Sequence, residues 1–98
     1  MKARLIMDRR IVLTPSAFAE LVIWEVPAPV AGSQHRFKYR LALVADSACV
    51  VRFDNEAGKG DHTHAGETER PYRFTTVDGL IADFRTHVER WLDEHGNS

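Results

Sequence analysis

The sequence predicts an α+β fold, in which an antiparallel sheet of five or six strands is followed by, and packed under, one long C-terminal helix. Two features predict this fold. Apolar side chains alternate with polar ones over much of the first 75 residues, and from residue 76 onward they recur with the 3.6-residue period of a helix. Strands that come first and a helix that comes last are typical of α+β domains. With 98 residues, the chain is expected to form a single domain (1–98), with the sheet in 2–75 and the helix in 76–95.

The predicted sheet begins with a hairpin and a central strand. Lys2–Thr14 is rich in β-branched and apolar residues and is interrupted at Asp8-Arg9-Arg10, which predicts a turn between two short strands. In Ala17–Val26, apolar residues occupy both faces of an alternating pattern, as in a strand with neighbours on both sides. The two prolines and the glycine of residues 27–34 then predict a loop.

The clearest alternation in the chain predicts the next strand, which is amphipathic. Its two faces hold Phe37, Tyr39, Leu41 and Leu43 on one side and Arg36, Lys38, Arg40 and Ala42 on the other. Cys49–Phe53 repeats the pattern, so a hairpin is expected to join the two segments. Because a slip of one residue would turn every side chain to the opposite face, the register has to bring the two apolar sets together.

A connecting loop of residues 46–48 meets this condition and pairs residues whose numbers sum to 94. The predicted cross-strand pairs are Leu43 with Val51, Leu41 with Phe53, Ala42 with Arg52, and Arg40 with Asp54. One face of the hairpin then displays four charged side chains together, namely Lys38, Arg40, Arg52 and Asp54.

An exposed loop and an edge strand are expected before the helix. Asn55–Thr68 contains three glycines and little apolar content, which is typical of a long surface loop. Arg70–Thr75 follows as a strand, with Pro71 marking an edge. Tyr72 and Phe74 in this strand are predicted to face inward.

The helix is predicted by one apolar stripe with charged residues opposite. The stripe consists of Val77, Leu80, Ile81, Phe84, Val88, Trp91 and Leu92. Thr75 or Thr76 is expected to cap the start of the helix, and Gly96 is expected to end it.

Composition and charge restrict the function classes. The 13 basic and 14 acidic side chains give a net charge of -1, so the molecule as a whole is not an obvious binder of polyanions, although Arg36, Lys38 and Arg40 form a local basic cluster. Cys49 is the only cysteine, so an internal disulfide is excluded. It lies in an apolar run that predicts a buried strand. No run reaches the length of a membrane span and no signal peptide is visible, so a cytoplasmic location is expected.

Two histidines follow a glycine-rich turn after the second charged strand. Gly58-Lys59-Gly60 presents backbone N–H groups and a lysine, as turns that hold phosphate oxygens do. His62 and His64 are two residues apart, so in an extended segment both imidazoles face the same side. They are therefore the main candidates for chemistry.

Three interpretations of these histidines are open. They can act as general acid and base in RNA cleavage, moving protons at a ribose 2′-oxygen and a leaving 5′-oxygen. They can bind zinc together with Asp61 or Glu67, although no tetrahedral ligand set is visible. They can also be two solvated loop histidines without a function.

The charged strands supply the remaining candidates. The predicted catalytic residues are His62, His64, Arg40 and Asp54, and the predicted substrate contacts are Lys38, Arg52, Asn55 and Lys59. Asp54 would orient Arg40 or a histidine, and the basic side chains would stabilise negative charge on the phosphate. The plain alternative is a solvated sheet face on which Arg40 pairs with Asp54. Trp24 and the other aromatic residues are predicted to lie in the core rather than stack on bases. No metal ion and no cofactor is expected.

Three segments of the chain carry a resemblance to a known family. They read Phe37-Lys38-Tyr39-Arg40, Val51-Arg52-Phe53-Asp54-Asn55 and Gly58-Lys59-Gly60-Asp61-His62-Thr63-His64. Together they resemble the TumE family of small bacterial toxin–antitoxin proteins. The resemblance continues into Pro71-Tyr72-Arg73-Phe74 and the C-terminal helix, so it covers most of the chain.

The resemblance implies the toxin component of a type II pair, encoded beside a DNA-binding antitoxin. RNA cleavage is a hypothesis from the residues and from analogy with other small toxins. The leading hypothesis is therefore a cytoplasmic, metal-independent endoribonuclease whose partners are RNA and its cognate antitoxin, with no membrane involved. The alternative is a non-catalytic module whose basic sheet face binds nucleic acid or an acidic segment of the antitoxin. Open edge strands are also compatible with a homo-oligomer.

Overall fold

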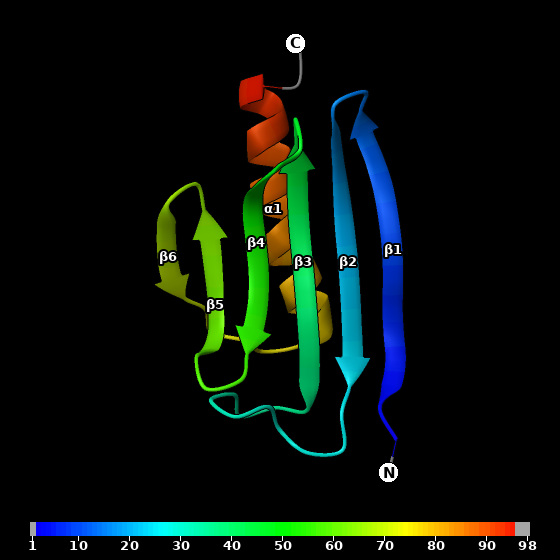
Figure 1. Cartoon of the computed structure of the whole chain (residues 1–98), viewed down its shortest axis with the longest axis vertical. Coiled ribbons are helices and arrows are strands. Elements are labelled where there is room, and N and C mark those ends of the chain that lie inside the picture. Colours follow the sequence, from blue (N-terminus) through cyan, green and yellow to red (C-terminus); the bar gives the residue numbers. More distant parts are fainter. Residues whose placement is uncertain (1, 96–98) are drawn as a thin grey trace.

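The computed structural model of the chain describes residues 2–95 and contains a six-stranded antiparallel sheet followed by one helix (Figure 1). The elements are β1 (Arg4–Thr14), β2 (Ala17–Glu25), β3 (Phe37–Ala45), β4 (Ala48–Glu56), β5 (Gly60–Ala65), β6 (Thr68–Pro71) and α1 (Val77–His95). Each strand pairs with the next one along the chain, so the sheet is a simple meander. The predicted α+β arrangement is confirmed.

The first strand is a single long edge strand. The Asp8-Arg9-Arg10 segment lies opposite residues 20–22 of β2, so the hairpin predicted within Lys2–Thr14 is wrong. Charged residues are tolerated in the middle of β1 because it is an edge strand, with β2 as its only neighbour. The turn occurs instead at Pro15-Ser16, where the residue types favour it. β2 has neighbours on both sides, as predicted.

The register of β3 against β4 is the predicted one. The pairs are Leu43 with Val51, Leu41 with Phe53, Ala42 with Arg52, and Arg40 with Asp54. The connection differs in detail, because it is a two-residue turn at Asp46 and Ser47, which have positive φ angles of 50° and 66°. Such a turn matches the twist of a hairpin, and a β-bulge after Leu43 takes up the one-residue difference from the predicted loop.

The segment predicted as an exposed loop contains a fifth strand. Residues 57–59 form a turn, and β5 then pairs with β4 along its whole length, so the loop predicted over Asn55–Thr68 is wrong. The alternation did not reveal this strand, because its two faces carry polar side chains instead of an apolar set: His62 and His64 on one face, and Asp61 and Thr63 on the other. β6 is correspondingly earlier and shorter than the predicted strand over Arg70–Thr75.

The helix covers one face of the sheet and leaves the other open (Figure 1). Leu80, Phe84 and Val88 enter the core, where burial of each apolar side chain contributes roughly 1.5–3 kcal/mol. The sheet contributes Ala19, Leu21, Ile23, Tyr39, Leu41, Leu43, Val51 and Phe53 to the same core. Tyr72 and Phe74 follow β6 and pack against this core, which confirms that they face inward.

The start of α1 is capped by one of the two predicted threonines, and the helix begins at Val77, one residue after the predicted start at 76. The hydroxyl of Thr76 accepts a hydrogen bond of 2.9 Å from the backbone N–H of Gly79, so Thr76 is the N-cap. Asp78 in the first turn adds a favourable interaction with the helix dipole. Gly96, the predicted end signal, lies outside the described residues.

Two predictions about burial are wrong. Cys49 is exposed at the start of β4, next to the tight turn, although the run around it is apolar. Trp24 is exposed on the face without the helix, where it lies opposite Lys38. Both faces of β2 are apolar, so the alternation could not show which of them the helix covers.

Two glycines bring a loop against the β4–β5 turn. The loop before β3 passes so close that a Cβ atom at Gly32 would lie 2.7 Å from the backbone nitrogen of Gly60. A hydrogen bond of 2.7 Å from the Gly58 N–H to the Ala31 carbonyl fixes the same contact. Gly32 also has a φ of 94°, in the region that favours glycine. The contact anchors the beginning of β5.

We therefore expect Gly32→Ala to destabilise the protein more than Gly58→Ala. Gly58 has a similar φ of 86°, but a Cβ atom there would meet nothing within 4 Å. The control should cost about 1–2 kcal/mol of unfolding free energy from backbone strain alone, and Gly32→Ala a further 1–3 kcal/mol, roughly, from the steric clash. Urea unfolding followed by circular dichroism measures both. Equal losses would contradict the importance of the contact.

Candidate functional site

The strand pairing collects the predicted site on the sheet face that the helix leaves open, which we call the helix-free face. Two rows of side chains cross it from strand to strand. One row consists of Arg40 on β3, Asp54 on β4 and His62 on β5, and the other of Arg52 on β4, His64 on β5 and Glu69 on β6. Residues directly opposite in antiparallel strands are close enough for their side chains to interact.

Asp54 is the centre of this group. Its Oδ1 lies 2.7 Å from His62 Nε2, and its Oδ2 lies 2.9 Å from Arg52 Nε. Asp54 is buried, so these two neighbours take the place of water around its carboxylate. Asp54 Oδ1 and Arg52 Nε make no aligned hydrogen bond within the described residues, so these two are close polar contacts without hydrogen-bond geometry. Asp54 therefore pairs with a histidine, as predicted, and with Arg52 rather than Arg40.

The two histidines have different hydrogen-bonding environments. Nδ1 of His62 lies 3.0 Å from the Gly60 carbonyl oxygen, and its Nε2 faces the Asp54 carboxylate, so both neighbours of the ring offer acceptor atoms. The Gly60 carbonyl can only accept, so Nδ1 of His62 is the donor in this hydrogen bond. His64 Nε2 instead lies 3.0 Å from Arg52 Nη2, and because a guanidinium can only donate, this nitrogen of His64 accepts. One imidazole is thus placed as a donor and the other as an acceptor.

Exposure also separates the two rings. The side chain of His62 is 5% exposed and that of His64 is 25% exposed. Their ring centroids lie 4.8 Å apart at a steep angle. Glu69, which was not predicted as a site residue, lies 3.9 Å from Nε2 of each ring. Its place opposite His64 depends on the β5–β6 turn, which the predicted loop concealed.

A basic strip extends the site along β3. Arg36, Lys38 and Arg40 are all exposed, and the alternation puts them on the helix-free face with Arg52. None of the three makes an ion pair within the described residues. Trp24 lies opposite Lys38, which adds an exposed aromatic ring to the strip. The sequence prediction missed this ring because it placed the tryptophan in the core.

Asn55 lies on the opposite side of β4 from the other predicted residues. It is 2% exposed, and its Nδ2 donates to the Phe37 carbonyl at 2.7 Å and to Ser33 Oγ at 3.2 Å. Its Oδ1 accepts from the Tyr39 N–H at 3.0 Å. These bonds join β3, β4 and the loop before β3, so the amide is occupied within the protein.

Asp61 is the equivalent residue of β5 on that inner side. Its carboxylate accepts from Tyr39 Oη at 2.8 Å, from Ser33 Oγ and from His35 Nε2 at 2.6 Å. Burial and the bond to Asp61 raise the pKa of Tyr39 well above its usual range, so the phenol stays a donor. The network holds the first residues of β5 in place, directly behind His62.

Lys59 lies apart from the histidines. It is exposed on the β4–β5 turn, and its Nζ is 3.6 Å from a carboxylate oxygen of Glu56. Exposed pairs of this kind contribute little to stability. Lys59 also lines a recess of about 510 Å³ with His35, Asp61 and Arg73.

Asp54, His62 and His64 are also the residues that can hold a metal ion. Their ligand atoms all lie within 4.8 Å of one another, and two imidazoles with one carboxylate suit zinc or iron(II). The Arg52 guanidinium already contacts both Asp54 and His64, so a metal ion would have to displace it. This set differs from the one that the sequence left open, because Asp61 lies in the inner network and Glu67 lies in the β5–β6 turn.

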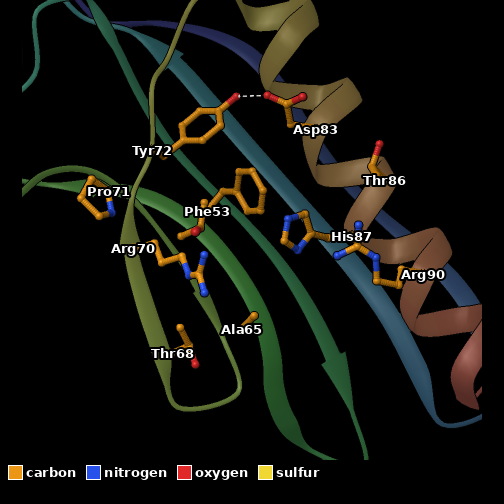
Figure 2. Close-up of a pocket in the computed structure, with 11 residues that line it drawn as sticks. Phe53, Ala65, Thr68, Arg70, Pro71, Tyr72, Asp83, Thr86, His87 and Arg90 are labelled. Atoms are coloured by element: carbon orange, nitrogen blue, oxygen red, sulfur yellow. Dashed lines mark hydrogen bonds between the residues drawn. The ribbon is translucent and has the colours of Figure 1, made fainter.

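A separate cleft lies on the other side of the β5–β6 hairpin, between it and α1 (Figure 2). Its volume is about 610 Å³, and Arg70, His87 and Arg90 line it. Tyr72 closes one end by donating a hydrogen bond of 2.6 Å to Asp83. Burial lowers the pKa of His87 below its ordinary value, and the Arg90 cation lowers it further, while Asp83 opposes the shift. No spacing in the sequence connects β6 with α1, so this cleft was not predicted.

Comparison with known proteins gives a match over almost the whole chain. The family model described as Toxin TumE matches residues 2–92 of the 98. No curated protein and no solved structure matches the chain significantly. Within residues 2–95, no helix has both the length and the apolar character needed to cross a bilayer.

The environment of His87 predicts a pH dependence of stability. Because its pKa is lower in the folded chain than the usual value of about 6.5, the unfolded chain binds more protons at acidic pH, and protonation favours unfolding. We expect the urea midpoint of the wild type to fall more steeply from about pH 7.5 to 5.5 than that of His87→Gln. His95→Gln is the matched control and should keep the wild-type slope. The same slope in all three proteins would contradict this assignment.

Proposed function

Because the chain belongs to the TumE toxin family, we propose that it is the toxin of a type II toxin–antitoxin pair and acts on RNA as a metal-independent ribonuclease. A cytoplasmic location and a cognate DNA-binding antitoxin are part of the same proposal. The observation that carries it is the contact between His64 and Arg52 on a basic, helix-free sheet face. This contact joins a partly exposed imidazole to a cation suited to phosphate.

RNA would lie along the basic strip of β3. Arg36, Lys38 and Arg40 are exposed and unpaired within the described residues, so they can contact successive phosphates without breaking an ion pair. Trp24 offers an aromatic surface on which an unpaired base can stack. A single strand laid on this strip would pass beside His64, because Arg40 and Arg52 lie on adjacent strands.

The chemistry would begin at His64. The substrate phosphate draws the Arg52 guanidinium toward it, which frees His64 Nε2 to take the proton of the ribose 2′-hydroxyl. The 2′-oxygen then attacks phosphorus, the bond to the 5′-oxygen breaks, and water supplies the proton for the departing oxygen. Arg40 and Arg52 stabilise the negative charge that builds up on the phosphoryl oxygens.

Asp54 and His62 would position these groups. The burial of His62 supports a role different from the proton transfer that the sequence predicted for it. Asp54 holds Arg52 through Oδ2 and His62 through Oδ1, so the guanidinium and the β4–β5 pairing are fixed together. Asn55 would act from the inner face of β4 in the same way, and Lys59 would contact the RNA from the neighbouring turn.

The alternative function is a binding module without catalysis. The same basic strip could hold nucleic acid or an acidic segment of the antitoxin, because both are anionic. In that case the positive charges would matter and His64 would be dispensable. The following two predictions separate the two functions.

We expect His64→Ala to abolish growth arrest when the protein is induced in bacteria, whereas His95→Ala should arrest growth like the wild type. His95 is a matched control because it lies at the end of α1, away from the helix-free face. Viable counts at equal soluble expression measure the effect, and mapping of RNA ends shows whether cleavage accompanies it. Arrest by His64→Ala at wild-type strength would reject the catalytic assignment. Cleavage that stops in EDTA and resumes with zinc would reject the metal-independent mechanism.

Removal of one charge from the strip should weaken RNA binding in a salt-dependent way. We expect Arg40→Gln to lower the slope of log K against log salt by about 0.7, the value for one contact with a single strand. Arg85→Gln is the control, because it removes the same charge from α1. Fluorescence anisotropy with a labelled single-stranded RNA, between about 50 and 200 mM salt, measures the slope. Equal slopes for both variants would place the RNA elsewhere.

A further inference from the structure

The edge strand β1 carries an apolar surface that nothing within the described chain covers. The large hydrophobic side chains exposed in residues 2–95 are Leu5, Ile6, Ile11, Val12 and Trp24. Four of these lie on β1, and Val12 is 74% exposed. β1 is eleven residues long and pairs only with β2. Long, apolar edge strands template pairing with another strand.

The opposite edge strand, β6, is shorter and less apolar. β6 has four residues, ends at Pro71 and carries charged side chains. Short edges with proline and charges are protected against pairing. Of the two edge strands in residues 2–95, β1 is therefore the open one.

The sequence of β1 is complementary to itself. Two copies of one strand can pair antiparallel about a two-fold axis perpendicular to the sheet. This axis keeps each side chain on its own face, so side chains of the same face meet. About Arg9, Asp8 lies opposite Arg10 of the second copy, and Met7 lies opposite Ile11. A centre at Asp8 or Arg10 would also oppose two like charges, and it would pair no residues of opposite charge. The Arg9 centre is the one that pairs opposite charges, and it does so twice.

The contacts that Asp8 and Arg10 make within the chain leave both side chains free to pair with a second copy. Asp8 makes no ion pair within the described residues, so its carboxylate has no cation of its own. Arg10 lies over the Phe18 ring, with 3.8 Å between its guanidinium carbon and the ring centroid, and therefore stays on the same face as Asp8. The unfavourable contact in this register is the one between the two Arg9 side chains, which carry like charges. Arg9 lines the cleft between β1 and α1 together with Asp78 and Arg85.

We propose that a second copy of this chain pairs with β1 in antiparallel register centred on Arg9. The two sheets then form one continuous sheet with both helices on the same face. The regular part of the pairing is residues 7–11, between the irregularities of β1 at Ile6 and Leu13. Ile6 and Val12 flank it, so part of the exposed apolar surface is covered. The basic strip of β3 stays free, because β1 and β2 lie between it and the second copy.

Cysteine cross-linking tests the register. In a Cys49→Ser background, Arg9→Cys should form a disulfide-linked dimer under mild oxidation, because opposed Cα atoms lie about 4.5–5.5 Å apart, within disulfide range. Asp8→Cys alone and Arg10→Cys alone should not cross-link, whereas a mixture of the two should. Cross-linking of Arg9→Cys no faster than that of the single variants would overturn the proposal.

Charge reversal tests the pairing without cysteines. We expect the wild type to sediment as a dimer, and Asp8→Arg or Arg10→Asp to raise the dimer dissociation constant by about tenfold or more, as like charges replace two opposed pairs. The double variant with both changes should restore the dimer, and circular dichroism confirms folding of each. A wild type that is monomeric at every concentration would overturn the proposal, and protection of β1 from hydrogen exchange only in complex with antitoxin would assign this edge to the antitoxin.

Discussion

The register of β3 against β4 is the constraint on which the site depends. A slip of β4 by one residue against β3 would turn Arg52 and Asp54 under the helix, away from Arg40, and bring Phe53 to the solvent. Two features prevent the slip: the two-residue turn at Asp46-Ser47 and the apolar residues that α1 needs for its core. Because charged and apolar residues alternate here, the register that buries the apolar side chains also places the charged ones on the helix-free face.

The β4–β5 hairpin uses neighbouring residues for opposite tasks. Asp54 points to the helix-free face and the adjacent Asn55 to the inner face, and His62 and Asp61 do the same on β5. The inner pair is bonded to β3 and to the loop before it, so the backbone under the histidines is held from behind. A site on a polar hairpin gains its rigidity in this way without an apolar face of its own.

Arg52 links the carboxylate of the site to one of its imidazoles. Its guanidinium lies against both Asp54 and His64, where a metal-dependent site would hold a cation. Arginine is always charged and presents several donors in a fixed plane, so it can satisfy a carboxylate in the resting state and a phosphate when one arrives. The buried carboxylate of Asp54 holds that charge near the sheet.

Strict alternation and helical periodicity were enough to predict β3, β4 and α1, and with them the neighbourhood of Arg40, Arg52 and Asp54. They were enough because side chains of one strand or helix report directly on the face it buries. The sequence could not predict β5, since a strand with polar residues on both faces resembles a loop. It could not place Glu69 near His64 or Trp24 outside the core, because those positions depend on which strands meet and which face the helix covers. Local pattern thus determined the elements, and long-range pairing decided which side chains form the site.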